Sequence, residues 1–123
     1  MTKATLKHIR DNLAMAGINY EFGEWTDDLV YPYWVGEYQE SPRMTEDGLC
    51  EATFILNGFS RGKYLDLEND KETIEKLFTY STAILEDGTG VSIEYDRALI
   101  VPTGDAELKR MQINLSIKEW RVI

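Results

Sequence analysis

The sequence predicts a single α+β domain over residues 1–123, with a mostly antiparallel sheet and two helices packed on one face. The chain has 123 residues, which is a common size for one domain with one buried core. Two segments repeat apolar residues at spacings of three and four, and five segments alternate apolar with polar residues. Short turns between neighbouring strands favour antiparallel pairing. The predicted order is therefore α-β-β-β-α-β-β.

The first helix is predicted over residues 2–16. Thr2 or Thr5 is suited to cap its start, and Gly17 follows its last turn. Its apolar stripe consists of Leu6, Ile9, Leu13 and Ala16.

The second helix is predicted over residues 70–85. Asn69 and Glu72 have the spacing of a capping pair at its start, and the run from Glu86 to Gly88 ends it. Its buried stripe is predicted to be Ile74, Leu77, Phe78, Ser81, Ile84 and Leu85.

Five segments have the alternation of strands. They are residues 18–24, 33–40, 49–57, 91–101 and 109–122. Gly36 suggests a bulge, residues 42–48 suggest a loop, and Asn57-Gly58 suggests the end of the third strand. The helical and alternating periods together predict one core. Its members are Leu6, Ile9, Leu13, Phe54, Leu56, Leu77, Phe78, Ile93, Ile113 and Leu115.

The formal net charge of −9 is concentrated in two acidic segments, residues 19–47 and 66–87. A chain this acidic is not suited to hold duplex nucleic acid, because that mode of binding needs clustered Lys and Arg. The acid either keeps the protein in solution or forms a surface that repels or imitates DNA.

The sequence offers little material for catalysis, and we expect no enzyme, no cofactor and no metal site. The only histidine, His8, lies off the apolar stripe of the first helix, and a serine or cysteine nucleophile normally needs a histidine partner. The only cysteine, Cys50, excludes an internal disulfide and a cysteine-based metal cluster, so we expect it to be a small buried apolar residue. The Gly-containing turns lack the spacing of a phosphate-binding loop. The acidic pairs in turns do not have the spacing of a calcium loop.

No apolar run approaches the roughly 20 residues of a membrane span. The N-terminal segment also lacks the continuous apolar stretch and cleavage site of a signal peptide. We therefore expect a protein that starts out in a cytoplasm.

An aromatic cluster accompanies the first acidic segment. It consists of Trp25, Tyr31, Tyr33, Trp34 and Tyr38. Because acids rather than bases lie between these residues, stacking on single-stranded nucleic acid is disfavoured. The cluster either fills the core or forms a protein interface, where Tyr and Trp are enriched.

Three stretches resemble a known family: YPYWVGEYQE, ILNGFSRGKYLDLENDKETIEKLF and VPTGDAELKRMQINLSIKEW. They are similar to small minor structural proteins of long-tailed phages and prophages, of the tail-terminator, tail-completion or head–tail joining type. The resemblance covers most of the chain from Tyr31 onward. It implies a virion protein, assembled in the host bacterial cytoplasm, that forms a ring homo-oligomer such as a hexamer and binds other tail or connector proteins. It implies no catalytic residues.

A ring through which DNA leaves the capsid needs a lumen to which phosphates do not adhere, and an acidic surface supplies one. The candidate lumen residues are Asp27, Asp28, Glu37 and Glu40. The candidate subunit interface is Tyr33, Trp34, Tyr38, Trp120 and Val122, the last two because they fall on the otherwise polar face of their strand. The alternative function is an acidic inhibitor, either an immunity protein or a DNA mimic, that binds a basic target.

Overall fold

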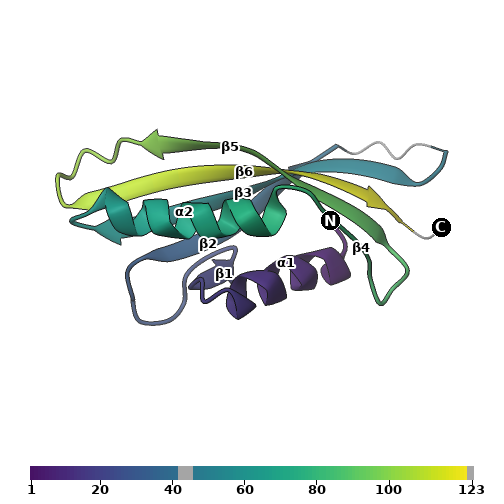
Figure 1. Cartoon of the computed structure of the whole chain (residues 1–123), viewed down its shortest axis with the longest axis horizontal. Helices are drawn as coiled ribbons and strands as arrows, with labels where there is room; N and C mark the ends of the chain where they lie inside the picture. The colour runs from purple at the N-terminus through teal and green to yellow at the C-terminus, as the bar shows by residue number, and fades with distance from the viewer. Residues whose placement is uncertain (42–45, 122–123) are drawn as a thin grey trace.

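The computed structural model describes residues 1–41 and 46–121, in which two helices and six strands form an α+β fold (Figure 1). The elements in chain order are α1 (Lys3–Met15), β1 (Tyr20–Phe22), β2 (Tyr33–Glu40), β3 (Leu49–Arg61), α2 (Tyr64–Phe78), β4 (Ser81–Ile84), β5 (Gly90–Val101) and β6 (Leu108–Trp120). The predicted loop over residues 42–48 falls partly on residues 42–45, which lie outside the described residues.

One twisted sheet contains all six strands in the order β1-β2-β3-β6-β5-β4 (Figure 1). Its centre is the antiparallel pair β3 and β6, which runs in unbroken register from Leu49 opposite Trp120 to Arg61 opposite Leu108. Only β1 pairs in parallel, with β2, because residues 23–32 carry the chain back before β2 begins. The sheet is therefore mostly antiparallel, as the sequence predicts.

One core cluster includes side chains from the sheet and from both helices. Strand β6 contributes Met111, Ile113, Leu115 and Ile117, which are all buried. Ile9 and Leu13 of α1 and Ile74 and Phe78 of α2 belong to the same cluster. Of the predicted core, eight residues are buried, whereas Leu6 and Leu77 are only partly buried against it. Cys50 is buried, as expected.

The predicted second helix is wrong at both ends. In the structure, α2 begins at Tyr64, with Lys63 as N-cap. Asn69 and Glu72 therefore lie inside the helix instead of capping it. It ends at Phe78, and residues 81–84 form β4, which the sequence did not predict. The apolar residues of this segment continue the helical spacing, which is why the sequence predicts a helix here. Residues 81–84 instead pair with β5, and the hydrogen bonds of this strand pair outweigh the helical spacing. Ile84, predicted to be buried, is 85% exposed.

Two glycines have roles other than those that the sequence predicts. Gly58 does not end the third strand, because β3 continues to Arg61. A Cβ atom at Gly58 would lie 2.5 Å from the Trp34 ring, so the glycine makes room for that ring inside a continuous strand. Gly36 forms no bulge and pairs in register with Leu56, while its missing side chain leaves space for Tyr20 and Phe54. The bulge lies between Tyr95 and Arg97 of β5.

The difference in burial between two leucines gives a test of this core. Leu115→Ala should lower the free energy of unfolding by about 2–5 kcal/mol, since Leu115 is fully buried and the cavity cannot collapse completely. Leu77→Ala is the matched control and should cost clearly less, because Leu77 only lines the edge of the cluster. Urea unfolding followed by circular dichroism measures both, and equal losses would contradict the assigned core.

Candidate protein-binding site

Four aromatic rings and two guanidinium groups are in contact on the side of the sheet that faces away from the core. We call this set the aromatic–arginine patch; it consists of Trp25, Tyr31, Tyr33, Phe59, Arg61 and Arg110. The ring centroid of Tyr33 lies 5.0 Å from that of Trp25, 5.5 Å from that of Tyr31 and 5.1 Å from that of Phe59. Arg61 lies over the Tyr31 ring and Arg110 over the Phe59 ring, both at 5.6 Å.

The register of three adjacent strands builds the centre of the patch. Tyr33 of β2 lies directly opposite Phe59 of β3, which in turn lies opposite Arg110 of β6. Because side chains alternate along a strand, these three residues share one face, while their neighbours Trp34, Gly58 and Met111 share the core face. The connection between β1 and β2 supplies Trp25, whose indole N–H donates to the Asp28 carbonyl at 3.2 Å.

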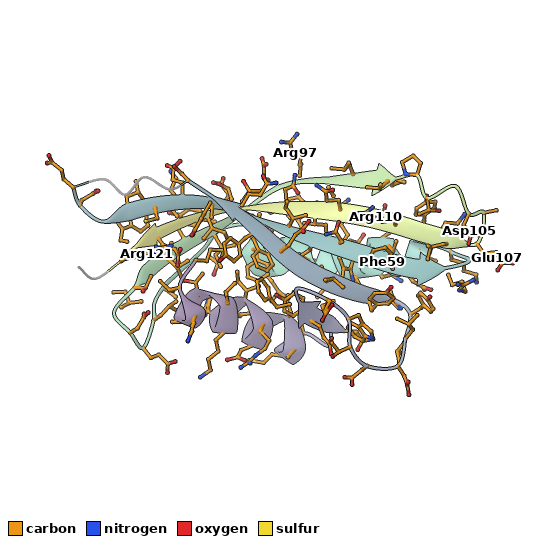
Figure 2. All side chains as sticks on the ribbon, turned by 180° about the vertical axis from the view of Figure 1, so that it is seen from behind. Phe59, Arg97, Asp105, Glu107, Arg110 and Arg121 are labelled. Atoms are coloured by element: carbon orange, nitrogen blue, oxygen red, sulfur yellow. The ribbon has the colours of Figure 1, made fainter. Side chains whose placement is uncertain are left out.

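A row of polar side chains holds Arg110 in place. Its Nη2 donates to Oδ1 of Asn57 at 2.9 Å, and Nδ2 of Asn57 donates to Oε1 of Glu37 at 3.3 Å. The row and the rings line an open cleft of about 360 Å³ between Trp25 and Arg110. Figure 2 shows Phe59 and Arg110 near one another, toward the end of the sheet where the turn with Asp105 and Glu107 lies.

The chemistry of the patch suits a protein partner. Tyr, Trp and Arg are enriched among the residues that dominate binding energy at protein interfaces. Burial, with a smaller effect from Tyr31, raises the pKa of the Tyr33 hydroxyl, so this ring stays neutral at physiological pH. The contacts between the rings restrain them, so little side-chain entropy remains to be lost on binding.

The structure separates the residues predicted for the subunit interface. Tyr33 is central to the patch, but Trp34 is fully buried in the core, where its indole N–H donates to Oδ2 of Asp70 at 2.9 Å. Trp34 is therefore unavailable to another subunit, and that assignment is wrong. Tyr38 is half-buried and stacks on Phe22 at 6.1 Å between ring centroids, away from the patch.

Two predicted interface residues lie at the C-terminal end of the chain. Trp120 is 39% exposed, and its side chain lies across from Gly90 of β5, with 3.7 Å between the Trp120 Cβ and a Cβ built at Gly90. Its position on the face away from the core agrees with the sequence pattern. Val122 lies outside the described residues.

The four predicted lumen acids have different surroundings. Asp27 and Asp28 are exposed in the connection before β2. Glu37 is part of the polar row beside the patch. Glu40 contacts the amine of Met1 and accepts a hydrogen bond from Arg121 at 3.0 Å. The charge of Glu40 is compensated within the chain, so Glu40 is no longer a candidate lumen residue.

Sequence reasoning missed Phe59, Arg61 and Arg110. The third strand was predicted to end at Asn57, so Phe59 and Arg61 fell outside any element. An alternation continued through Gly58 would have placed Phe59 on the polar face with Tyr33. Their contact with Arg110 depends on strand register, which no local pattern shows.

A buried carboxylate forms a second polar cluster. Glu119 is 1% exposed, and its Oε2 accepts from the Thr2 N–H at 3.1 Å and from the Thr5 hydroxyl at 2.5 Å. Nη2 of Arg121 donates to its Oε1 at 3.2 Å. Burial acts to raise the pKa of Glu119, but these hydrogen bonds and Arg121 outweigh it and hold the pKa below its usual range. Thr2 and Thr5 lie at the start of α1, and Glu119 lies on β6. Their hydrogen bonds therefore hold the start of the helix against this strand.

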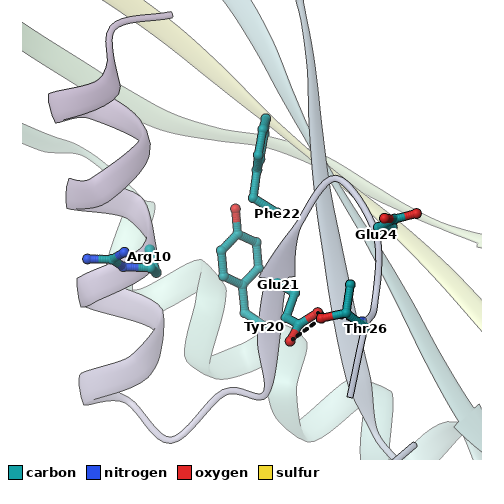
Figure 3. A pocket seen from close by; sticks show the side chains of 6 residues that line it. All are labelled: Arg10, Tyr20, Glu21, Phe22, Glu24 and Thr26. Atoms are coloured by element: carbon teal, nitrogen blue, oxygen red, sulfur yellow. Dashed lines mark hydrogen bonds between the residues drawn. The ribbon is translucent and has the colours of Figure 1, made fainter. Parts of the chain in front are cut away.

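A wider depression of about 400 Å³ lies between α1 and β1 (Figure 3). Figure 3 shows Arg10 on α1 and Tyr20, Glu21 and Phe22 on β1. The Glu21 carboxylate accepts from the Thr26 N–H at 2.8 Å and from its hydroxyl at 3.2 Å, which braces the turn after β1. Arg10, Glu21 and Thr26 are engaged within the chain and the Tyr20 hydroxyl is buried, so the depression is a weaker candidate than the patch.

Within residues 1–41 and 46–121, no group of three or more His, Cys, Asp or Glu side chains is placed to hold a metal ion. Neither helix of these residues has the length and apolar character needed to cross a membrane. No protein-family model matches the chain, and no curated protein matches its sequence.

The Glu119 cluster makes stability depend on pH. A carboxyl whose pKa is lower in the folded chain than in the unfolded chain stabilises the fold fully above the unfolded value, near 4.3, and loses this effect as pH falls below it. Glu119→Gln should cost about 1–3 kcal/mol at pH 7, as expected for hydrogen bonds to a charged group, and should flatten the acid limb of the stability profile.

Urea unfolding between pH 3 and pH 7 tests this prediction. Glu94→Gln, at an exposed glutamate of β5, is the control and should follow the wild-type profile. If Glu119→Gln also retains the wild-type acid limb, the carboxylate does not fasten α1 to β6.

Proposed function

We propose that the chain is a non-enzymatic assembly protein that binds other protein subunits through the aromatic–arginine patch. The observation that carries this proposal is the contact of four aromatic rings with two guanidinium groups on one face of the sheet. A patch of this kind is unusual on a surface that stays in contact with water. Its aromatic rings have a large apolar area, and its guanidinium groups are planar hydrogen-bond donors, and both suit a desolvated interface.

The partner proposed from the sequence resemblance is a second copy of the chain in a ring. In this proposal the ring belongs to the head–tail junction of a long-tailed phage or prophage and is of the tail-terminator or tail-completion type. The protein is then assembled in the bacterial cytoplasm, resides in the virion, and also binds neighbouring tail or connector proteins. The proposal takes both helices to pack on the core face of the sheet, so that the opposite face remains for contact.

A closed ring needs two different surfaces that fit each other on each subunit. The patch supplies one, and we assign the other to an acidic surface that Arg61 and Arg110 can face. Helix α2 carries exposed acids at Asp66, Glu72 and Glu75 and is suited to this role. Asp27 and Asp28 remain the candidate lumen acids, because they are exposed and no described contact compensates them.

Tyr33 is the residue whose removal tests the proposal. Tyr33→Ala removes the ring that contacts Trp25, Tyr31 and Phe59, so it should lower ring formation at least tenfold while leaving the subunit folded. Sedimentation velocity at rising protein concentration measures the assembled fraction, and electron microscopy of the same samples shows whether the particles are rings.

Tyr80→Ala is the matched control, because Tyr80 is an exposed tyrosine that follows α2 and lies outside the patch. It should assemble like the wild type. Normal assembly of Tyr33→Ala would rule out the patch as the contact. A wild-type protein that remains monomeric, even with isolated phage tails present, would rule out the ring.

A further inference from the structure

Strand β5 has one edge that is only partly covered. Edge strand β4 pairs with Gly90–Ile93, the first part of β5, and its ladder ends there. From Arg97 to Val101, β5 pairs with β6 on one side, and no strand of the described residues pairs with it on the other. Backbone groups that point away from β6 in this segment thus have no ladder partner.

The open segment reads Arg97-Ala98-Leu99-Ile100-Val101; the usual protections of an edge, a charge, a bulge and a proline, lie at or beyond its two ends and leave Ala98 to Val101 without one. Natural edges carry Lys or Pro, or lie under a helix or loop, because a bare edge is a template for another strand. Here Leu99 is 41% exposed on the face away from the core, and Ile100 is 52% exposed on the core face. Both faces of the segment therefore present apolar side chains that a neighbouring strand could cover.

Two features limit what can pair with this edge. The bulge between Tyr95 and Arg97 interrupts the ladder at one end, and Pro102 closes the other, because its ring removes a backbone donor. The available window is thus the five residues from Arg97 to Val101, with Leu99 at its centre. After Val101 the chain turns back and enters β6 at Leu108.

We propose that this window pairs with the same window of a second copy, antiparallel and about a two-fold axis at Leu99. A two-fold axis perpendicular to the sheet places the same face of both copies on the same side of the joined sheet. Paired residues must therefore point to the same face, so their positions in the sequence differ by an even number. Centring on Leu99 meets this condition, because Leu99 meets Leu99 of the second copy, Ala98 meets Ile100, and Arg97 meets Val101. Each exposed apolar side chain then has an apolar neighbour, and no like charges lie directly opposite.

This contact goes beyond the proposed ring, since it uses the edge of β5 and not the aromatic–arginine patch. Five paired residues per copy bury little area, so the dimer is weak and dissociates on dilution. It would give one sheet continuous across the axis. Arg110 of β6 lies opposite Val101 of β5, so the patches of the two copies would lie close to the axis.

The geometry predicts a specific cross-link. In a Cys50→Ala background, Leu99→Cys places two thiols directly opposite each other at the axis, within about 4.5–5.5 Å between Cβ atoms. A short thiol-specific cross-linker should convert most of this variant to covalent dimer at protein concentrations where the unlabelled protein sediments as a dimer. Met15→Cys, at an exposed residue at the end of α1, is the control and should give at least tenfold less dimer.

Leu99→Lys gives a second measurement that needs no cross-linker. The substitution places two like charges opposite each other at the axis. It should therefore shift the monomer–dimer transition to at least tenfold higher concentration without altering the unfolding midpoint of the monomer. A protein that stays monomeric to millimolar concentration overturns the proposal. So does a dimer in which Leu99→Cys and Met15→Cys cross-link equally, or one that Leu99→Lys leaves unchanged. Because Leu99 lies outside the patch, the two variant results leave the Tyr33 test of the ring unaffected, whereas a protein that stays monomeric counts against the dimer and leaves the ring to the test with isolated phage tails.

Discussion

The close approach of the Trp34 ring to the backbone at Gly58 is the contact on which the rest of the structure depends. Trp34 is fully buried, and any side chain at position 58 would overlap its ring. The two residues face each other across β2 and β3, so this contact fixes the register of that pair. The Trp34 indole also donates to Asp70, which places α2 against the same ring. Burial raises the pKa of Asp70, although this hydrogen bond acts in the opposite direction.

The same register produces the aromatic–arginine patch. One step along each strand from Trp34 and Gly58 are Tyr33 and Phe59, and alternation sends their side chains to the opposite face. A one-residue slip of β2 would bring Tyr33 to the core face, away from Phe59, and the indole of Trp34 into water. The core therefore determines which side chains form the patch on the opposite face of the sheet. Strand β6 extends this relation, since Met111 packs in the core while Arg110 lies over Phe59.

The acidity of the chain has more than one role. Glu119 and Glu40 are used internally, with Arg121 between them, and join the start of the chain to β6 and β2. Glu37 belongs to the polar row that positions Arg110. Part of the acidic composition is thus used in contacts within the chain. In this acidic molecule, Arg61 and Arg110 stand out because they lie against aromatic rings, where a guanidinium can stack and still donate hydrogen bonds.

The sequence by itself determined the α+β class, the extent of α1, strand β2, the central strand β6 and most of the core. These follow from periodicity, which is a local property that burial on one face imposes on a helix or a strand. Tertiary structure alone decided the β4 segment, the continuation of β3 through Gly58, the buried role of Trp34 and the pairing of Tyr33 with Phe59 and Arg110. Each of these depends on residues far apart in the chain: a glycine beneath a ring, a ladder with a distant strand, or a register. A local pattern carries no information about which strand will lie alongside, and that neighbour decides whether an aromatic residue belongs to the core or to the surface.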